Sequence, residues 1–197
     1  MTCETTKIYL VRHGETVWNT EKRWQGSQNS ELTDLGKQQA AQARDILKEK
    51  HFDLAYVSPL NRAVQTIDII LEGKGMNITT LPAVQEINMG QWEGRTQAEI
   101  AIAEPEQANN FWHRPDLFNV DGAETFTQLQ HRVVQGLNEL FDKHQGSNIL
   151  VVSHWVAIKV ALAYYSNIEL KNLSELPNPK NAELICFTKS GDEIRVS

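Results

Sequence analysis

The sequence predicts an α/β sandwich whose sheet is largely parallel. Short apolar runs of strand length alternate with segments in which apolar residues recur every three or four positions, as in amphipathic helices. This alternation is typical of strand–helix–strand units, which build parallel sheets covered by helices. The chain has 197 residues, of which 41% are hydrophobic and 22% charged, and this suits one globular domain.

Four apolar runs predict core strands, and two weaker runs predict further strands. The four runs are residues 8–11, 54–57, 149–152 and 184–187, and the weaker ones are 78–81 and 193–196. The sequence KSGD before the last run suits a hairpin turn, so we expect 184–187 and 193–196 to pair.

Four helices are predicted between these strands. The first begins after Thr33, a suitable N-cap residue, and ends near residue 50. The second, NRAVQTIDIILEG, ends at Gly73, where a helix-terminating glycine is expected. The third spans about 124–144 and has a strong amphipathic pattern, and the fourth, VAIKVALAYY, directly follows the strand near His154.

Residues 95–122 interrupt the alternation of strands and helices. This segment holds two prolines, an acidic cluster and three aromatic residues, without strong periodicity. A long segment of this kind is typically a lid over a site. We therefore expect a single domain over residues 1–197, with a short cap insertion at about 95–122.

Composition and charge argue against several classes of partner. The formal net charge of −6 is unsuited to nucleic acid, whose phosphate backbone requires a basic surface. The most apolar stretch is interrupted by His154 and Lys159, so no membrane span is predicted, and no secretory signal is visible. We expect a cytoplasmic protein in which Cys3 and Cys186 are free thiols, and the oligomeric state stays open.

Three predicted strands end in basic residues. The first ends in Arg12 and His13, Arg62 follows the second, and His154 ends the third. Because the carboxyl ends of parallel strands share one edge of a sheet, we expect these four side chains to converge. Guanidinium groups match phosphate oxygens, and nearby cations keep an imidazole neutral and able to attack phosphorus. The pattern predicts phosphoryl transfer through a phosphohistidine.

The leaving group in such a reaction needs a proton donor. Chemistry alone leaves three carboxyl groups open for this role, those of Glu15, Glu86 and Glu93. A metal enzyme that uses His13, His154 and a carboxylate as ligands is an alternative.

Six segments also resemble one family in the family's order. They are LVRHGET, WNTEKRWQGSQNSELTDLGKQQA, VSPLNRAVQT, EINMGQWEG, DGAET and VVSH. Together they cover nearly the whole chain and resemble the histidine phosphatase superfamily, the phosphoglycerate-mutase-like proteins. The resemblance implies a three-layer α/β/α sandwich with a mostly parallel mixed sheet, and it implies neither a metal nor another cofactor.

The resemblance also implies a role for individual residues. His13 resembles the phosphorylated nucleophile, and Glu86, which opens the sequence EINMGQWEG, resembles the general acid and base. The phosphate pocket is implied to consist of Arg12, Arg62 and His154, and Asn19, Gln25 and Gly26 match positions that line the pocket.

Two positions depart from the family pattern. Trp155 follows the second histidine, where the family usually has glycine, so a positive φ there would strain the backbone. Our hypothesis is that Trp155 lies at the substrate site and restricts substrate size. GAET replaces the more usual GES, which leaves Glu124 as a weak match outside the expected site.

The charge of the predicted cap distinguishes between two possible activities, phosphatase and mutase. The charged residues of the cap are mostly acidic, which is unfavourable for retaining a bisphosphate intermediate. We therefore expect a metal-independent phosphatase that hydrolyses a small phosphomonoester through a phosphohistidine. The alternatives are a 2,3-bisphosphoglycerate-dependent phosphoglycerate mutase and a phosphate-binding module without catalysis. The partner is expected to be a small phosphorylated metabolite, which the sequence does not identify.

Overall fold

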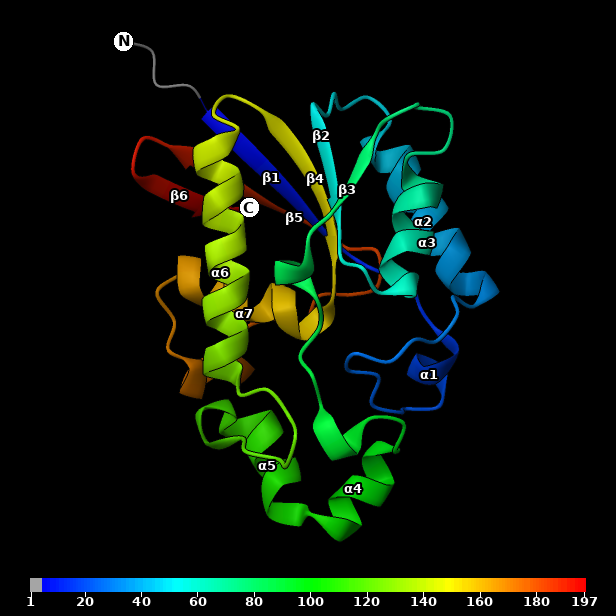
Figure 1. The fold of residues 1–197 in the computed structure, drawn as a ribbon, viewed down its shortest axis with the longest axis vertical. Coiled ribbons are helices and arrows are strands. Elements are labelled where there is room, and N and C mark those ends of the chain that lie inside the picture. The colour runs from blue at the N-terminus through cyan, green and yellow to red at the C-terminus, as the bar shows by residue number, and fades with distance from the viewer. Residues whose placement is uncertain (1–4) are drawn as a thin grey trace.

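A computed structural model describes residues 5–197, so Cys3 lies outside the described residues (Figure 1). Within that range the strands form one six-stranded sheet in the order β3-β2-β4-β1-β5-β6. The strands are β1 (Thr5–Arg12), β2 (Leu54–Val57), β3 (Ile78–Thr80), β4 (Asn148–Ser153), β5 (Leu184–Ser190) and β6 (Glu193–Val196). All six predicted strands are confirmed, with differences of a few residues at their ends.

The sheet is mixed and mostly parallel, as predicted. β4 pairs in parallel with both β1 and β2, and β3 pairs in parallel with β2. β5 runs antiparallel to β1 and forms the expected hairpin with β6, in which Ser190 pairs with Glu193. Gly191 provides the positive φ, 60°, that this two-residue turn requires.

Helices cover both faces of the sheet. The helices of the described residues are α1 (Val17–Thr20), α2 (Asp34–Leu47), α3 (Asn61–Ile70), α4 (Gln97–Ala103), α5 (Pro105–His113), α6 (Phe126–Lys143) and α7 (Trp155–Tyr165), of which α2, α3, α6 and α7 cover the sheet. Thr33 caps α2 as predicted, because its Oγ1 accepts a hydrogen bond from the Gly36 N–H at 3.0 Å.

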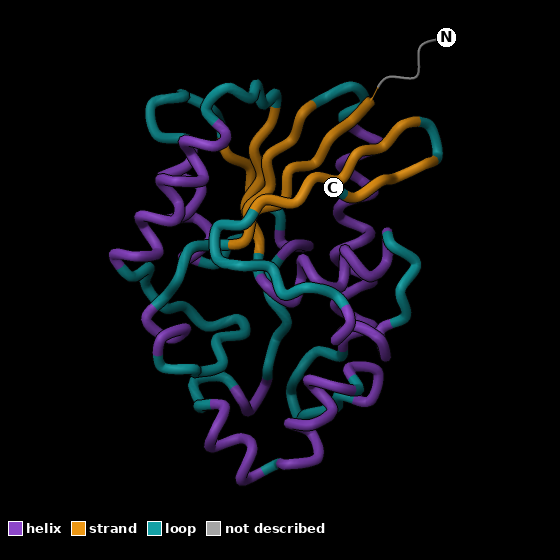
Figure 2. The backbone as a smooth tube through the Cα atoms, turned by 180° about the vertical axis from the view of Figure 1, so that it is seen from behind, coloured by secondary structure: helices purple, strands orange, loops and turns teal. Residues whose placement is uncertain are grey.

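Two separate apolar clusters show the three layers. Side chains alternate along a strand, so Ile8 and Leu10 of β1 pack with α6 and α7, whereas Tyr9 and Val11 pack with α2 and α3. Figure 1 shows α6 on one side of the sheet and α2 and α3 on the other, and Figure 2 shows the twisted sheet from behind. The predicted three-layer α/β/α sandwich is confirmed.

The segment 95–122 is more regular than its sequence suggested. It contains α4, α5 and the short 3₁₀ turn η3 (Pro115–Leu117), beyond the carboxyl ends of the strands (Figure 1). Glu104 and Pro105 separate the two helices, so neither is long enough to show a clear period in the sequence. Phe111 and Phe118 are buried in the cluster that also holds α6 and α7.

Two further expectations concern chemistry and location. Cys186 is a free cysteine, as expected. Over residues 5–197, the helices are too short or too polar to cross a bilayer.

Candidate active site

A cavity of about 120 Å³ lies where the end of β1, the segment around α1 and the first turn of α7 meet the start of α4. It is smaller than the roughly 300–1,000 Å³ typical of pockets for drug-sized ligands. The expected site residues that line it are Arg12, His13, Asn19, Gln25, Gly26, Arg62, Glu86 and Trp155. His154 lies next to this lining, with its ring centroid 5.2 Å from that of His13.

The imidazole of His13 is held in one orientation. Its Nδ1 lies 2.7 Å from the carbonyl oxygen of Gly14, which can only accept a hydrogen bond. Nδ1 must therefore carry the proton, and in the neutral ring this leaves the lone pair on Nε2. His13 is 3% exposed and lines the cavity, so Nε2 is available to a bound electrophile.

The surroundings lower the pKa values of the site histidines and of Arg62. Burial, together with the cations of Arg62 and Arg12, holds the pKa of His13 well below its usual value. Burial and Arg62 hold the pKa of His154 well below its usual value in the same way. Burial also lowers the pKa of Arg62 to about 10, so Arg62 stays protonated at neutral pH.

Backbone carbonyls fix the two arginines at the cavity. Arg62 donates to the oxygens of Gly26 and Gln28 at 2.8 and 2.6 Å, and Arg12 donates to Pro179 O at 2.7 Å. The buried Nε atoms of both arginines have no hydrogen-bond partner. Buried donors of this kind suit the oxygens of an anion, for which guanidinium groups have matching geometry.

His154 is held by Ser58. The Nε2 atom of His154 lies 2.6 Å from Ser58 Oγ, and its buried Nδ1 has no hydrogen-bond partner. Ser58 Oγ also accepts the Leu60 N–H at 3.4 Å, so its own proton is free for Nε2. In that arrangement Nδ1 carries the ring proton and is a further donor beside the arginines.

The three candidate carboxyl groups lie in different places. Glu86 lines the cavity, and its oxygens accept the N–H groups of Val156, Ala157 and Ile87 at 3.0–3.2 Å. Glu93 instead accepts hydrogen bonds from Ser27, beside Gly26, and Glu15 accepts one from Thr33. Of the three, only the Glu86 side chain belongs to the cavity lining.

Gly14 has a packing role that the sequence did not reveal. A Cβ atom on Gly14 would lie 2.4 Å from Gly36 O, and one on Gly36 would lie 2.0 Å from Glu15 O. The chain after His13 therefore touches the first turn of α2 backbone to backbone, and both positions require glycine.

Trp155 forms part of the cavity wall without backbone strain. Within residues 5–197, the non-glycine residues at positive φ are Lys22, Asn167 and Ala182, so Trp155 is not among them. Its indole ring packs 5.5 Å from Trp112 and 6.0 Å from Phe111, both of α5. The sequence hypothesis that Trp155 lies at the substrate site fits this placement.

Several lining residues were missed by the sequence reasoning. They are Trp18, Lys22, Arg23, Trp24, Ile87, Met89, Gln97 and Val156. Lys22 and Arg23 lie inside the segment WNTEKRWQG, whose pattern marks the region without assigning these two charges to the cavity. The positive φ of Lys22, 53°, and the loop that depends on it leave no clear signal in the sequence.

Comparisons with known proteins show the family of the chain. The family model described as "Histidine phosphatase superfamily (branch 1)" matches residues 8–197. The chain belongs to this superfamily. Phosphoserine phosphatase 1 of Hydrogenobacter thermophilus is 30% identical over 164 residues, which are 83% of this chain and 78% of that protein.

Two further comparisons bear on activity and fold. Phosphoglycerate mutase-like protein 4 of Arabidopsis thaliana is 35% identical over 156 residues, 78% of this chain and 68% of that protein. The structure of Bacillus stearothermophilus YhfR superposes with a TM-score of 0.95 at 32% identity, covering 98% of this chain and 95% of that one. Family membership and the phosphatase-named relative support a phosphatase, and hence a hydrolase, as the general class.

Proposed function

We propose that this protein is a metal-independent phosphatase that hydrolyses a small phosphomonoester through a phosphohistidine at His13. The observation that carries the proposal is the buried His13 ring, whose Nδ1 proton is donated to Gly14 O beside the buried Arg62 and the half-buried Arg12. A nucleophilic nitrogen next to unpartnered guanidinium donors suits a phosphoryl group and its oxygens.

The proposed reaction has two steps. In the first, the lone pair of His13 Nε2 attacks phosphorus, an N–P bond forms and the P–O bond to the alcohol breaks. Glu86, protonated at this stage, gives its proton to the leaving oxygen. In the second, water attacks phosphorus, Glu86 takes a proton from that water, and the N–P bond breaks to release phosphate.

The remaining site residues hold the phosphoryl group in this scheme. Arg12, Arg62 and the Nδ1–H of His154 are the donors to its oxygens in both steps. Asn19 and Gln25 line the same cavity and complete the polar side of the substrate site.

The charges of the cap favour a phosphatase over a mutase. Arg95 pairs with Glu104 and Arg114 pairs with Asp116, and of residues 95–122 the cavity lining includes only Gln97. A mutase must retain a doubly charged intermediate, and a cap without a cation at the cavity gives it little attraction. Two observations favour a mutase instead: the similarity to a phosphoglycerate mutase-like protein, and the presence of Lys22 and Arg23 in the cavity lining.

The test is hydrolysis of p-nitrophenyl phosphate in excess chelator. We expect wild type and His51→Ala, a control at an exposed histidine, to be active. His13→Ala should be at least about 10³-fold slower. Intact-protein mass after an alkaline quench should show one added phosphoryl group on wild type and none on His13→Ala.

Each alternative predicts a different result. Loss of activity in chelator would support a metal enzyme, although no group of three His, Cys, Asp or Glu side chains in residues 5–197 is placed to hold a metal ion. Rapid conversion of 3-phosphoglycerate with a 2,3-bisphosphoglycerate primer, without phosphate release, would support the mutase. Phosphate binding without turnover in either assay would support a binding module.

A further inference from the structure

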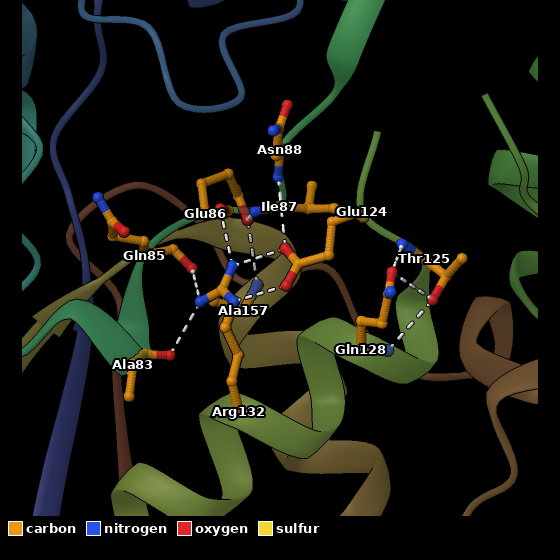
Figure 3. A network of polar contacts seen from close by, with 10 residues as sticks. All are labelled: Ala83, Gln85, Glu86, Ile87, Asn88, Glu124, Thr125, Gln128, Arg132 and Ala157. Atoms are coloured by element: carbon orange, nitrogen blue, oxygen red, sulfur yellow. Dashed lines mark hydrogen bonds and ion pairs between the residues drawn. The ribbon is translucent and has the colours of Figure 1, made fainter. Parts of the chain in front are cut away.

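Arg132 on α6 commits its whole guanidinium group to one short segment and one carboxylate. Its Nη1 donates to the carbonyl oxygens of Ala83 and Gln85, both at 2.9 Å, and its Nη2 donates to Glu86 O at 3.0 Å. Nε and Nη2 also donate to Glu124 at 2.6 and 2.7 Å (Figure 3). These are five bonds for the five N–H donors of an arginine.

The segment that Arg132 binds has little regular structure to support it. It follows the short β3 and contains only the 3₁₀ turn η1 (Pro82–Val84) before Glu86. Ser153 Oγ donates to Val84 O at 2.7 Å, so the four successive carbonyls 83–86 all receive a side-chain donor. Two side chains, from α6 and β4, thus replace the hydrogen bonds that a strand or helix would supply.

Glu124 extends this support to the far side of Glu86. Its backbone N–H donates to Asn88 O at 2.9 Å, and its Oε2 accepts the Asn88 N–H at 3.4 Å. Gly90 brings the two chains together, because a Cβ atom there would lie 2.4 Å from Asp121 O. The Arg132–Glu124 pair therefore holds the backbone on both sides of Glu86.

We propose that Arg132 and Glu124 are positioning residues for Glu86, the proposed general acid and base. The Glu86 side chain extends from the backbone that Arg132 and Glu124 hold to the first turn of α7. There the N–H groups of Val156 and Ala157 donate hydrogen bonds to its carboxylate. A shift of about 1 Å in the backbone would misalign a proton transfer. The proposal rests on the proposed function through the role of Glu86.

The pair has the geometry of a positioning contact. The Arg132 and Glu124 side chains are 28% and 16% exposed, beside an open groove on the surface. Nε and Nη2 of Arg132 bind the two carboxylate oxygens of Glu124 in parallel, which fixes the orientation of both groups. This geometry depends on a planar, multidentate donor, which lysine cannot reproduce.

The experiment measures kcat/KM on three esters with increasingly good leaving groups: phenyl, 4-nitrophenyl and 2,4-dinitrophenyl phosphate. A poor leaving group needs its proton, whereas 2,4-dinitrophenolate does not. We expect Arg132→Lys to lose roughly 10- to 100-fold on phenyl phosphate and less than about 3-fold on 2,4-dinitrophenyl phosphate. Arg44→Lys, at an ion pair between α2 and the more exposed Glu72, should leave all three rates unchanged.

Glu86→Gln separates failure of this proposal from failure of the proposed function. Selective loss in Glu86→Gln with uniform loss in Arg132→Lys would overturn the positioning role alone. Uniform loss in Glu86→Gln would refute the acid role of Glu86, and the positioning role with it. If Arg132→Lys does not fold, Glu124→Gln, which keeps its volume and one acceptor oxygen, should show the same selective pattern, and a uniform loss there would overturn the proposal.

Discussion

The phosphate side and the carboxylate side of the cavity are built in different ways. Arg12, His13 and His154 lie at the ends of strands in the middle of the sheet, and Arg62 lies in the first turn of α3. Glu86 lies in an irregular segment whose carbonyls are bound by side chains from other elements. Regular structure therefore fixes the groups proposed to bind phosphate, and long-range side-chain contacts fix the group proposed to move the proton.

This difference predicts different responses to mutation. A group that holds the phosphoryl oxygens acts on every ester, because all esters share those oxygens. A group that protonates the leaving oxygen acts mainly on esters whose leaving group is poor. The leaving-group dependence of kcat/KM therefore distinguishes the two sides of the cavity.

Arg62→Lys should have the largest effect. Arg62 is 1% exposed, and a lysine would lose both the fork toward phosphate and the bonds to Gly26 and Gln28. We expect kcat/KM to fall about 10³-fold on phenyl, 4-nitrophenyl and 2,4-dinitrophenyl phosphate alike. A loss confined to phenyl phosphate would mean that Arg62 acts in proton transfer, and the proposed difference between the two sides of the cavity would be wrong.

Trp155→Ala should have the next largest effect, on substrate preference. In the sequence, Trp155 stands between His154 and Val156, whose N–H binds Glu86. Its side chain lines the cavity. We expect the ratio of kcat/KM for a bulky phosphomonoester to that for a small one to rise at least roughly 10-fold, because the wall recedes. Trp112→Ala, which removes the ring packed against Trp155, should raise the ratio less. An unchanged ratio in Trp155→Ala would show that Trp155 does not restrict substrate size.

Ser153→Ala should have a smaller effect that sharpens the comparison. Ser153 is at the end of β4, yet its Oγ donates to Val84 O on the carboxylate side. Its loss leaves a buried carbonyl without that donor and should cost about 1–3 kcal/mol of unfolding free energy in urea. Turnover of phenyl phosphate should fall a few-fold more than that of 2,4-dinitrophenyl phosphate, and Ser190→Ala, at the exposed end of β5, should change neither.

The convergence of the basic residues could be predicted from the sequence for a physical reason. Strand period, strand end and basic residue are all local features, so the residue pattern alone places Arg12, His13 and His154 at one edge of the sheet. The apolar periods likewise predicted α2 and α6, and the KSGD turn predicted the β5–β6 hairpin.

The carboxylate side could not be predicted from local pattern. Local chemistry does not choose among Glu15, Glu86 and Glu93, and the contacts that place the Glu86 carboxylate at the cavity come from α7, far away in the chain. Family resemblance pointed to Glu86, but it set Glu124 aside, although Glu124 binds Arg132 directly behind Glu86. Lys22 was missed because its place at the cavity depends on a loop with positive φ.

The pH dependence of stability gives the smallest and most specific test of the phosphate side. The folded-state pKa values of His13 and His154 lie well below the usual 6.5, mainly because of burial. Below about pH 6.5 the unfolded chain therefore binds protons that the folded chain does not. The unfolding free energy should be constant with respect to these groups above that pH and should fall as pH decreases toward the folded-state values.

Urea unfolding at pH 7.5 and 5.5 measures this loss. Each histidine contributes a slope of at most about 1.4 kcal/mol per pH unit in that window. His154→Gln should therefore lose less stability between the two pH values than wild type, whereas His51→Ala, at an exposed histidine, should lose as much as wild type. An equal loss in wild type and His154→Gln would mean that His154 is not kept neutral by its surroundings, and the neutral donor assigned to it at the phosphate would be wrong.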